Sequence, residues 1–480
     1  MELKFIALIW LTFLFLPPEW SRAVDDVIPA APAEKGSTGN SGCRACHRVE
    51  LDEHHRLDCL VCHRGGNENT RDKERAHAGM VFRPAHPDAM EKSCGECHGD
   101  LVRMNSSSLH FTLKNVVNLV RHHFGANADI EDPGRIPEIS RPRTPLELAD
   151  DMLRRRCLRC HISTGGDAYP LVRRGSGCAA CHLRFRNGTM QSHKFQRLPD
   201  DNQCLSCHYG NRVGADYYGR FEHDFNNEYR TPYTTGDDFF RPYGVEYHQL
   251  VPDIHRQRGL ACIDCHSGAS LMGDSLAEKP SCSSCHPAKD GEGGVLIGKL
   301  SGANHPLPPR RDPAHRKYDD KIACTVCHAA WSFQDNGDHL LLSHSDDFDP
   351  WTNLTVQGNA ELEELLLQAE EDESDVEAVM TDIPTGEKKP GIWYRGYGTR
   401  RWEEIPVRRD VDGIIKVFRP ILDLHLSAVD GQGNVILDDF SLPAAGYLPY
   451  TPHTIGPAGI YHRHRFDHLI PDKAAQKEMK

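Results

Sequence analysis

The residues of this 480-residue chain that most clearly carry chemistry are its 18 cysteines, which all follow one pattern. Each belongs to a C-x-x-C pair, and a histidine follows each pair at once. The nine copies are Cys43/Cys46-His47, Cys59/Cys62-His63, Cys94/Cys97-His98, Cys157/Cys160-His161, Cys178/Cys181-His182, Cys204/Cys207-His208, Cys262/Cys265-His266, Cys282/Cys285-His286 and Cys324/Cys327-His328. Paired cysteines serve zinc sites, redox dithiols, disulfide scaffolds or the covalent attachment of haem.

The recurring histidine separates these four chemistries. A zinc site needs two pairs that converge on one ion, and it does not require an adjacent histidine. A redox dithiol needs a single copy, and a disulfide scaffold has no use for the histidine. C-x-x-C-H is the attachment signal for c-type haem. Since positions i and i+3 lie on one face of a helical turn, two thiols there can reach one porphyrin edge. The next residue can then turn its imidazole onto the iron.

Over residues 43–328 the chain resembles the multihaem cytochromes c, on the strength of these nine motifs. The resemblance implies nine covalent haem c groups, with the 18 cysteines as thioether donors and the nine motif histidines as proximal iron ligands. It also accounts for the lean hydrophobic content of 39%, because haem faces would take the place of apolar side chains in the core.

A haem iron takes a second axial ligand, which decides between electron transfer and chemistry at the metal. Of 29 histidines, 20 lie outside the motifs, which favours histidine on both sides of the iron over the nine available methionines. Several free histidines stand a few residues before a motif, as in "DIHRQRGLACIDCHSG". The candidate distal ligands are His55 (or its neighbour His54), His77, His86, His110, His123, His193, His223, His248, His255, His315, His339 and His344. Any one of them can equally be a surface histidine.

The spacing of the motifs suggests internal units. Successive first cysteines are 16, 35 and 63, then 21, 26 and 58, then 20 and 42 residues apart. A short step, a medium step and a long gap recur, which suggests three three-haem units at about 43–156, 157–261 and 262–345. Coincidence of loop lengths is the alternative. The short steps predict that haems one and two, four and five, and seven and eight lie closest together.

These motifs need elements that position them. We expect a mostly α and irregular multihaem cytochrome c fold with a haem-filled core over residues 43–330. Short helices are expected around 113–123, 146–158 and each motif. Residues 346–480 lack cysteine and predict a small mixed α/β region packed on the haem domain. It should hold an acidic helix within 359–381 and a β-hairpin or small sheet within 413–440. The terminal His462, His464 and His468 belong to a tail that could also reach an iron.

The first residues predict export. Lys4 precedes an apolar run, Phe5–Leu16, and residues 1–23 read as a cleaved signal peptide, followed by a flexible leader at 24–42. The run is shorter than the roughly 20 residues that span a bilayer, so we expect no membrane span after cleavage. The expected location is the periplasm, or the extracellular or outer surface. A net charge of −13 disfavours nucleic acid as a partner.

Electron transfer along the nine haems is the function these features favour, between respiratory partners such as a quinol-oxidising membrane complex or other cytochromes. One alternative is a reductase of a small N-, S- or Se-oxyanion at a haem with an open axial site. All nine motifs end in histidine, whereas related nitrite and tetrathionate reductases often carry lysine at the active haem. Another alternative is the subunit of an extracellular cytochrome filament. The sequence identifies no catalytic residue and no oligomeric state.

Overall fold

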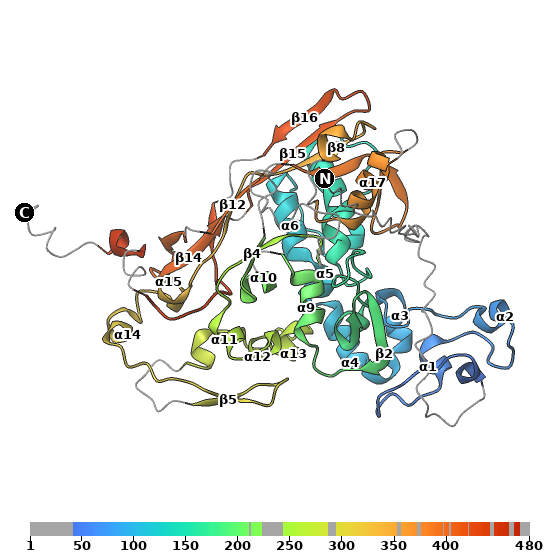
Figure 1. The fold of residues 1–480 in the computed structure, drawn as a ribbon, viewed down its shortest axis with the longest axis horizontal. Helices are drawn as coiled ribbons and strands as arrows, with labels where there is room; N and C mark the ends of the chain where they lie inside the picture. The colour runs from blue at the N-terminus through green and yellow to red at the C-terminus, as the bar shows by residue number, and fades with distance from the viewer. Residues whose placement is uncertain are drawn as a thin grey trace, which may run out of the picture.

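The computed structural model describes residues 42–210, 213–222, 243–286, 294–352, 357–371, 376–396, 398–402, 405–420, 422–441, 446–459 and 465–470. All nine motifs lie in these ranges. The predicted signal peptide, almost all of the leader, and His223, His462 and His464 lie outside them. Figure 1 shows the motif-bearing helices running across the lower half of the molecule, with the sheets of the C-terminal region above them.

The region that carries the motifs is built from short helices and turns. They are η1 (Gly42–Ala45), α1 (Cys59–His63), α2 (Lys73–His77), α3 (Pro87–Ser93), α4 (Gly95–Ser106), α5 (Leu109–Thr112), α6 (Lys114–His123), η2 (Pro133–Arg135), α7 (Pro145–Arg155), η3 (Cys157–Cys160), α8 (Cys178–His182), α9 (Asp201–His208), α10 (Gly214–Tyr217), α11 (Ile254–Gln257), α12 (Cys262–Cys265), α13 (Gly268–Leu271), η5 (Cys282–Ser284), α14 (Pro313–Tyr318) and α15 (Cys324–His328). Three two-stranded pieces join them: β1 (Leu183–Arg186) with β2 (Thr189–Phe195), β3 (Arg220–Glu222) with β4 (Tyr247–Gln249), and β5 (Val295–Ile297) with β6 (Asn304–Pro306).

The two longer helices predicted between the motifs are present as α6 and α7. Helix α7 begins with a capping box. The Thr144 hydroxyl accepts a hydrogen bond from the Glu147 amide, and the Glu147 carboxylate accepts one from the Thr144 amide. Pro145 at the first helical position adds to this start signal. The helix ends at Arg155, immediately before the fourth motif. The local sequence therefore sets where this motif begins.

The C-terminal region is richer in strands than a single hairpin. Its elements are β7 (Gln334–Asn336), β8 (Asp338–Ser343), α16 (Asp349–Thr352), α17 (Ala360–Glu371), β9 (Val379–Thr381), β10 (Lys388–Pro390), β11 (Ile392–Arg395), β12 (Thr399–Arg401), β13 (Val407–Arg409), β14 (Ile415–Pro420), β15 (Leu424–Val429), β16 (Val435–Phe440), β17 (Tyr447–Pro449) and η7 (Asp467–Leu469). The largest sheet has the order β11-β8-β15-β16, in which β15 runs parallel to β8 and antiparallel to β16. The β15–β16 pair is the hairpin expected around residues 430–434.

Strand β8 lies inside this sheet although the sequence boundary at 345/346 assigned its residues to the third haem unit. Leu342 on β8 is buried with Leu426 on β15 and Trp393 on β11. The same cluster includes Leu148 and Leu153 of α7. An ordinary apolar core thus joins the helices before motif four to the C-terminal sheet. A boundary read from cysteine positions misses this, because strand pairing is a long-range property.

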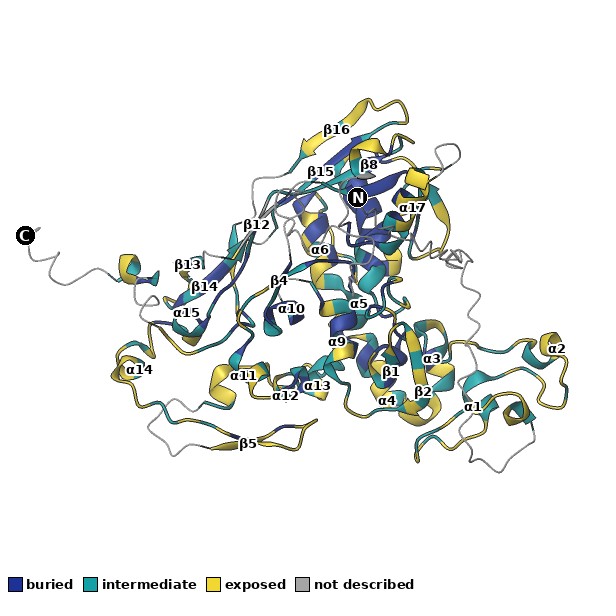
Figure 2. Cartoon of the chain, in the orientation of Figure 1, coloured by how far each residue is buried: buried dark blue, intermediate teal, exposed yellow. Residues whose placement is uncertain are grey.

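Apolar packing is much sparser around the motifs themselves. The clusters there are small and separate, such as Ala85 with Ala179 and Leu183, or Phe221 with Trp331 and Phe333. Figure 2 shows buried residues gathered around α6 and the β8–β15 sheet, whereas α1 and α2 are half-buried or exposed. Among the described residues, no helix has the length and apolar character needed to cross a membrane.

Candidate haem centres

Each motif lies in or beside a single helical turn. In the third motif, for example, the His98 amide donates to the Cys94 carbonyl at 2.8 Å, and in the seventh the His266 amide donates to the Cys262 carbonyl at 2.9 Å. Such a turn places both thiols on one side and turns the following histidine toward the same edge. All 18 cysteines are described, and none of them forms a disulfide.

Many of the predicted thioether donors are exposed or half-buried, and Cys46, Cys97 and Cys285 are three of them. Each is the second cysteine of its motif, and its amide donates to the carbonyl of the first at 3.2, 3.2 and 3.3 Å, respectively. Cys46 and Cys97 are exposed and Cys285 is half-buried, and none of the three thiols makes a hydrogen bond to a described residue. Their attachment to haem stays a prediction that rests on the motif alone.

Seven of the nine motif histidines face a second histidine from elsewhere in the chain. The ring centroids are separated by 5.8 Å in His47–His77, 6.2 Å in His98–His55, 6.4 Å in His63–His193, 6.1 Å in His208–His110, 6.4 Å in His266–His453, 6.1 Å in His286–His255 and 6.0 Å in His328–His315. Two imidazoles on one metal, with bonds of about 2.0–2.1 Å on each side, place their centroids roughly 6.3 Å apart. The observed separations fit one iron between the rings of each pair.

Hydrogen bonds at Nδ1 hold many of these rings and leave Nε2 for a metal. Histidines that bind metals commonly donate their other ring nitrogen to a carbonyl or carboxylate. This pattern recurs in His63 to the Val81 carbonyl at 2.9 Å, His77 to Lys73 at 2.7 Å, His110 to Leu271 at 3.3 Å, His182 to Gln196 at 2.7 Å, His328 to Gly456 at 3.0 Å, and His255 to the Asp253 carboxylate at 2.8 Å. Because these oxygens only accept, Nδ1 carries the proton.

Two motif histidines, His161 and His182, face no histidine ring within the described part of the chain. The Nε2 of His161 donates to the Phe111 carbonyl at 2.7 Å, and its Nδ1 accepts from the Ser163 hydroxyl at 2.6 Å. Burial lowers the pKa of His161, in keeping with a neutral ring. His86 lies nearby, since its Nε2 donates to the Ser163 carbonyl at 3.1 Å.

Six of the predicted distal candidates lie opposite a motif histidine: His55, His77, His110, His193, His255 and His315. His248 stacks on Phe221 instead.

Three other candidates do not lie opposite a motif histidine in the described residues, and their role as distal ligands stays a prediction. In the described residues His123, His339 and His344 make no ring contact with a motif histidine. His123 packs edge-on against Phe124 at the end of α6, and burial lowers its pKa. The Nε2 of His339 lies 2.8 Å from the Ser427 hydroxyl across the β8–β15 pair. The β8 sheet draws His339 away from the motifs.

The sequence analysis missed His453, which stacks opposite His266 with an interplanar angle of 16°. No motif lies near it in the sequence, so spacing gave no signal. Its segment is fastened by the Ile455 amide donating to the Asp253 carboxylate at 2.6 Å and by the Gly456 carbonyl accepting from His328. Asp253 also accepts from His255, so one buried carboxylate positions parts of two centres, those of motifs seven and eight.

Mutual effects between thiols show which motifs are neighbours. The thiols of four pairs lie close enough to shift one another's pKa: Cys94 with Cys178, Cys160 with Cys207, Cys204 with Cys262, and Cys282 with Cys324. Motif three therefore lies beside five, four beside six, six beside seven and eight beside nine. These pairs cross the proposed unit boundaries after residues 156 and 261, so spatial neighbours are not confined to one three-motif unit.

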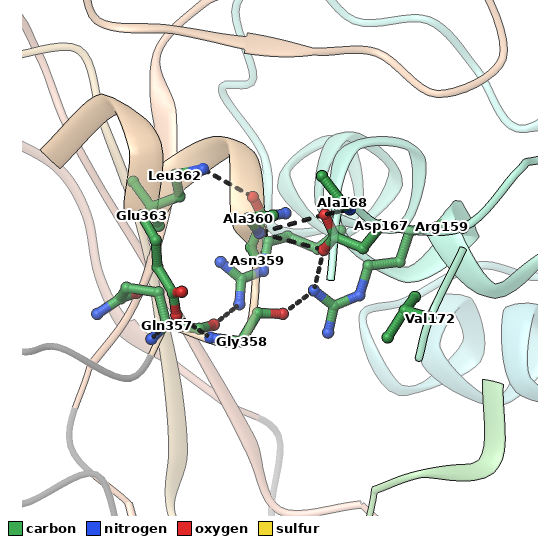
Figure 3. A network of polar contacts seen from close by, with 12 residues as sticks. Arg159, Asp167, Ala168, Val172, Gln357, Gly358, Asn359, Ala360, Leu362 and Glu363 are labelled. Carbon is green, nitrogen blue, oxygen red and sulfur yellow. Dashed lines mark hydrogen bonds and ion pairs between the residues drawn. The ribbon is translucent and has the colours of Figure 1, made fainter. Parts of the chain in front are cut away.

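Arg156 and Arg159 bind motif four to the C-terminal region. The Arg159 guanidinium pairs with Asp167 at 3.4 Å and donates to the Gly358 carbonyl. The Ala360 amide, at the start of the acidic helix α17, donates to Asp167 at 3.2 Å (Figure 3). Arg156 donates to the carbonyls of Trp393 and Gln357, and burial with the charge of Arg159 lowers its pKa to about 9. The N-terminus of α17 thus packs against this motif, and several positive charges surround it.

Two motif side chains sit in surroundings that disfavour their charged form. Burial lowers the pKa of His208 to about 4 and raises that of Cys181 to about 11. The donor set and the facing imidazoles together fit haem c.

A protein-family model described as cytochrome c3 matches residues 254–337, which hold the last three motifs together with His255 and His315. The match supports a multihaem c-type cytochrome with covalently bound haem c and a role in electron transfer. No match was found among the curated proteins or the solved structures.

Proposed function

We propose that this chain is an exported nonahaem cytochrome c that carries electrons between respiratory redox partners. The observation that carries the proposal is the set of seven histidine pairs, each joining a motif histidine to a second histidine at the separation that one iron requires. Nothing in zinc, disulfide or dithiol chemistry calls for facing histidine pairs beside seven C-x-x-C motifs.

In this proposal, the 18 cysteines bind the haem edges and the nine motif histidines are the proximal ligands. The distal ligands are His77, His193, His55, His110, His453, His255 and His315 for motifs one, two, three, six, seven, eight and nine. The haem supplies a one-electron couple at its iron, whose potential responds to ligands, burial and hydrogen bonds. The protein contributes the imidazoles, their Nδ1 partners and the short steps between sites.

The thiol pairs support an order for the haems that differs from the chain order. Besides the four thiol pairs named above, thiols of motifs one and two, two and three, five and six, and seven and eight lie near enough to raise one another's pKa on top of the effect of burial. This supports the path one–two–three–five–six–seven–eight–nine, which motif four joins at five and six, since the Gly177 amide donates to the Ile162 carbonyl at 2.6 Å. Electrons would run along the path and exchange with motif four.

The partners and location of this cytochrome belong to the same proposal. We propose a quinol-oxidising membrane complex or another cytochrome as redox partner, and the periplasm or outer surface as the location. The net charge of −13 favours a partner with a basic docking face.

Intact mass and optical spectra test the proposal on the purified holoprotein. We expect nine haem masses per chain and ferric spectra dominated by low-spin iron, because most irons have two imidazoles. The Cys178→Ser/Cys181→Ser variant should lose one haem mass, which verifies the assignment of a motif. A count well below nine, or mainly high-spin iron, would overturn it.

A reductase is the second candidate, and His182 is the observation that favours it. Its Nδ1 is held by the Gln196 carbonyl, but no histidine of the described chain faces its ring. An iron with one open axial position can bind a small anion. A shift in the spectrum of a single haem on addition of nitrite or cyanide would support this candidate. Unchanged spectra would reject it, and electron transfer would remain as the function.

A further inference from the structure

A cavity of about 170 Å³ lies where motifs four, five and six meet. Leu183, the residue after His182, lines it, and so does Ser206, the residue before Cys207. Arg174 also lines it and donates from Nη2 to the carbonyls of Arg159 and His161, at 3.1 and 3.2 Å. Since a water molecule takes up about 30 Å³ of liquid volume, the cavity has room for an anion of four or five heavy atoms.

The lining is positively charged. Arg173, Arg174 and Arg186 contribute to it, and no aspartate or glutamate is among the lining residues. Asn187 and Asn202 add amide groups. Guanidinium groups present planar pairs of N–H donors that match the oxygens of an oxyanion, and hydrogen bonds to a charged acceptor are the stronger kind.

Two buried side chains in this wall have polar atoms that lack a partner among the described residues. Arg174 is 5% exposed, and its Nε has no acceptor. Gln203 is 8% exposed; its Nε2 donates to the Leu183 carbonyl at 3.2 Å, but its Oε1 has no donor. A buried polar atom left unpaired costs about 1–3 kcal/mol. Arg174 and Gln203, which both line the cavity, thus each bring one unused hydrogen-bonding atom, a donor and an acceptor.

We propose that this arginine pocket, defined by Arg173, Arg174, Arg186 and Gln203, binds a small oxyanion such as sulfite or phosphate from solution. The proposal rests on the proposed function only in placing the anion beside the haems of motifs four, five and six. The facing-histidine pattern adds to it, because His161 and His182, the two motif histidines without a facing ring in the described chain, both border this region.

Isothermal titration calorimetry on the holoprotein at low ionic strength tests the pocket, with sodium sulfite and sodium phosphate as separate probes. The Arg173→Gln/Arg186→Gln variant removes two exposed pocket cations and spares the buried Arg174. We expect its affinity for either probe to fall at least tenfold. Arg184→Gln is the matched control. Arg184 lies on β1, as Arg186 does, but it binds Gln196 and Asp200 and does not line the pocket. The control should keep wild-type affinity.

Three results would overturn the proposal. Absence of binding to the wild-type protein would mean that no solution anion enters, as when the propionates of a bound haem occupy the arginines. Equal weakening in Arg184→Gln would indicate unspecific surface charge, and unchanged affinity in the double variant would place the anion elsewhere. Intact mass on the same samples gives the haem count, so failure of the pocket and failure of the haem assignment are distinguished.

Discussion

Replacement of His453 is the sharpest test of the ligand assignment, because only the tertiary structure brings this residue to a motif. The His266 and His453 centroids are 6.4 Å apart, near the roughly 6.3 Å that two metal–imidazole bonds produce. With alanine at 453, one iron in nine loses its distal imidazole. We therefore expect about one ninth of the ferric absorbance to move from low-spin to high-spin, with the haem mass unchanged because the thioethers remain.

Optical and EPR spectra of His453→Ala measure this change, and added imidazole should restore the low-spin fraction. His425→Ala is the control, since His425 is also a half-buried histidine of the C-terminal region but bonds to Asp439 and Asp423. A His453→Ala spectrum identical to wild type, or the same high-spin fraction in both variants, would refute the assignment of His453 as a ligand.

Three further predictions concern the groups around the centres. Asp253→Asn weakens the acceptor for His255 Nδ1, which makes the imidazole a poorer electron donor and favours the reduced iron. We expect the potential of the haem at motif eight to rise by about 59 mV, which is a roughly tenfold change in its one-electron equilibrium, in a spectroelectrochemical titration. Arg156→Met removes a buried positive charge beside motif four, so one haem potential should fall, and an unchanged titration curve would contradict this. Although burial raises the pKa of Asp52, hydrogen bonds from His55 and backbone amides outweigh that effect and lower it to about 2. This folded pKa lies below the ordinary value of 3.8, so the contribution of Asp52 to stability is full above about pH 4 and is lost as the pH falls toward 2. We expect about 1–2 kcal/mol, measured as a flatter acid-unfolding curve for Asp52→Asn.

Local spacing explains how much of the candidate site could be predicted. C-x-x-C-H fits within one helical turn, so its geometry needs no distant residue, and all nine motifs adopt such a turn or lie beside one. His315 also lies within reach of its motif along the chain, since it precedes His328 by 13 residues. The short segment between such a histidine and its motif limits how far apart the two side chains can lie.

The longer pairings and the order of the centres depend on the tertiary structure. His63 meets His193, and His266 meets His453, across more than a hundred residues. Sequence proximity favoured His339 equally, but the pairing of β8 with β15 holds it beside Ser427. The same sheet anchors the helices before motif four, and this motif contacts motif five through the Gly177 amide, which donates to the Ile162 carbonyl at 2.6 Å.

The chemistry of this protein can be read from its amino-acid sequence alone, because covalent attachment of haem requires residues fixed in one turn. Which histidine faces which motif, and which motifs are neighbours, depends on the folded chain. Those are contacts between segments whose approach is set by strand register, by buried ion pairs such as Arg154–Asp382, and by the packing of apolar side chains. None of these is encoded in the spacing of the motifs.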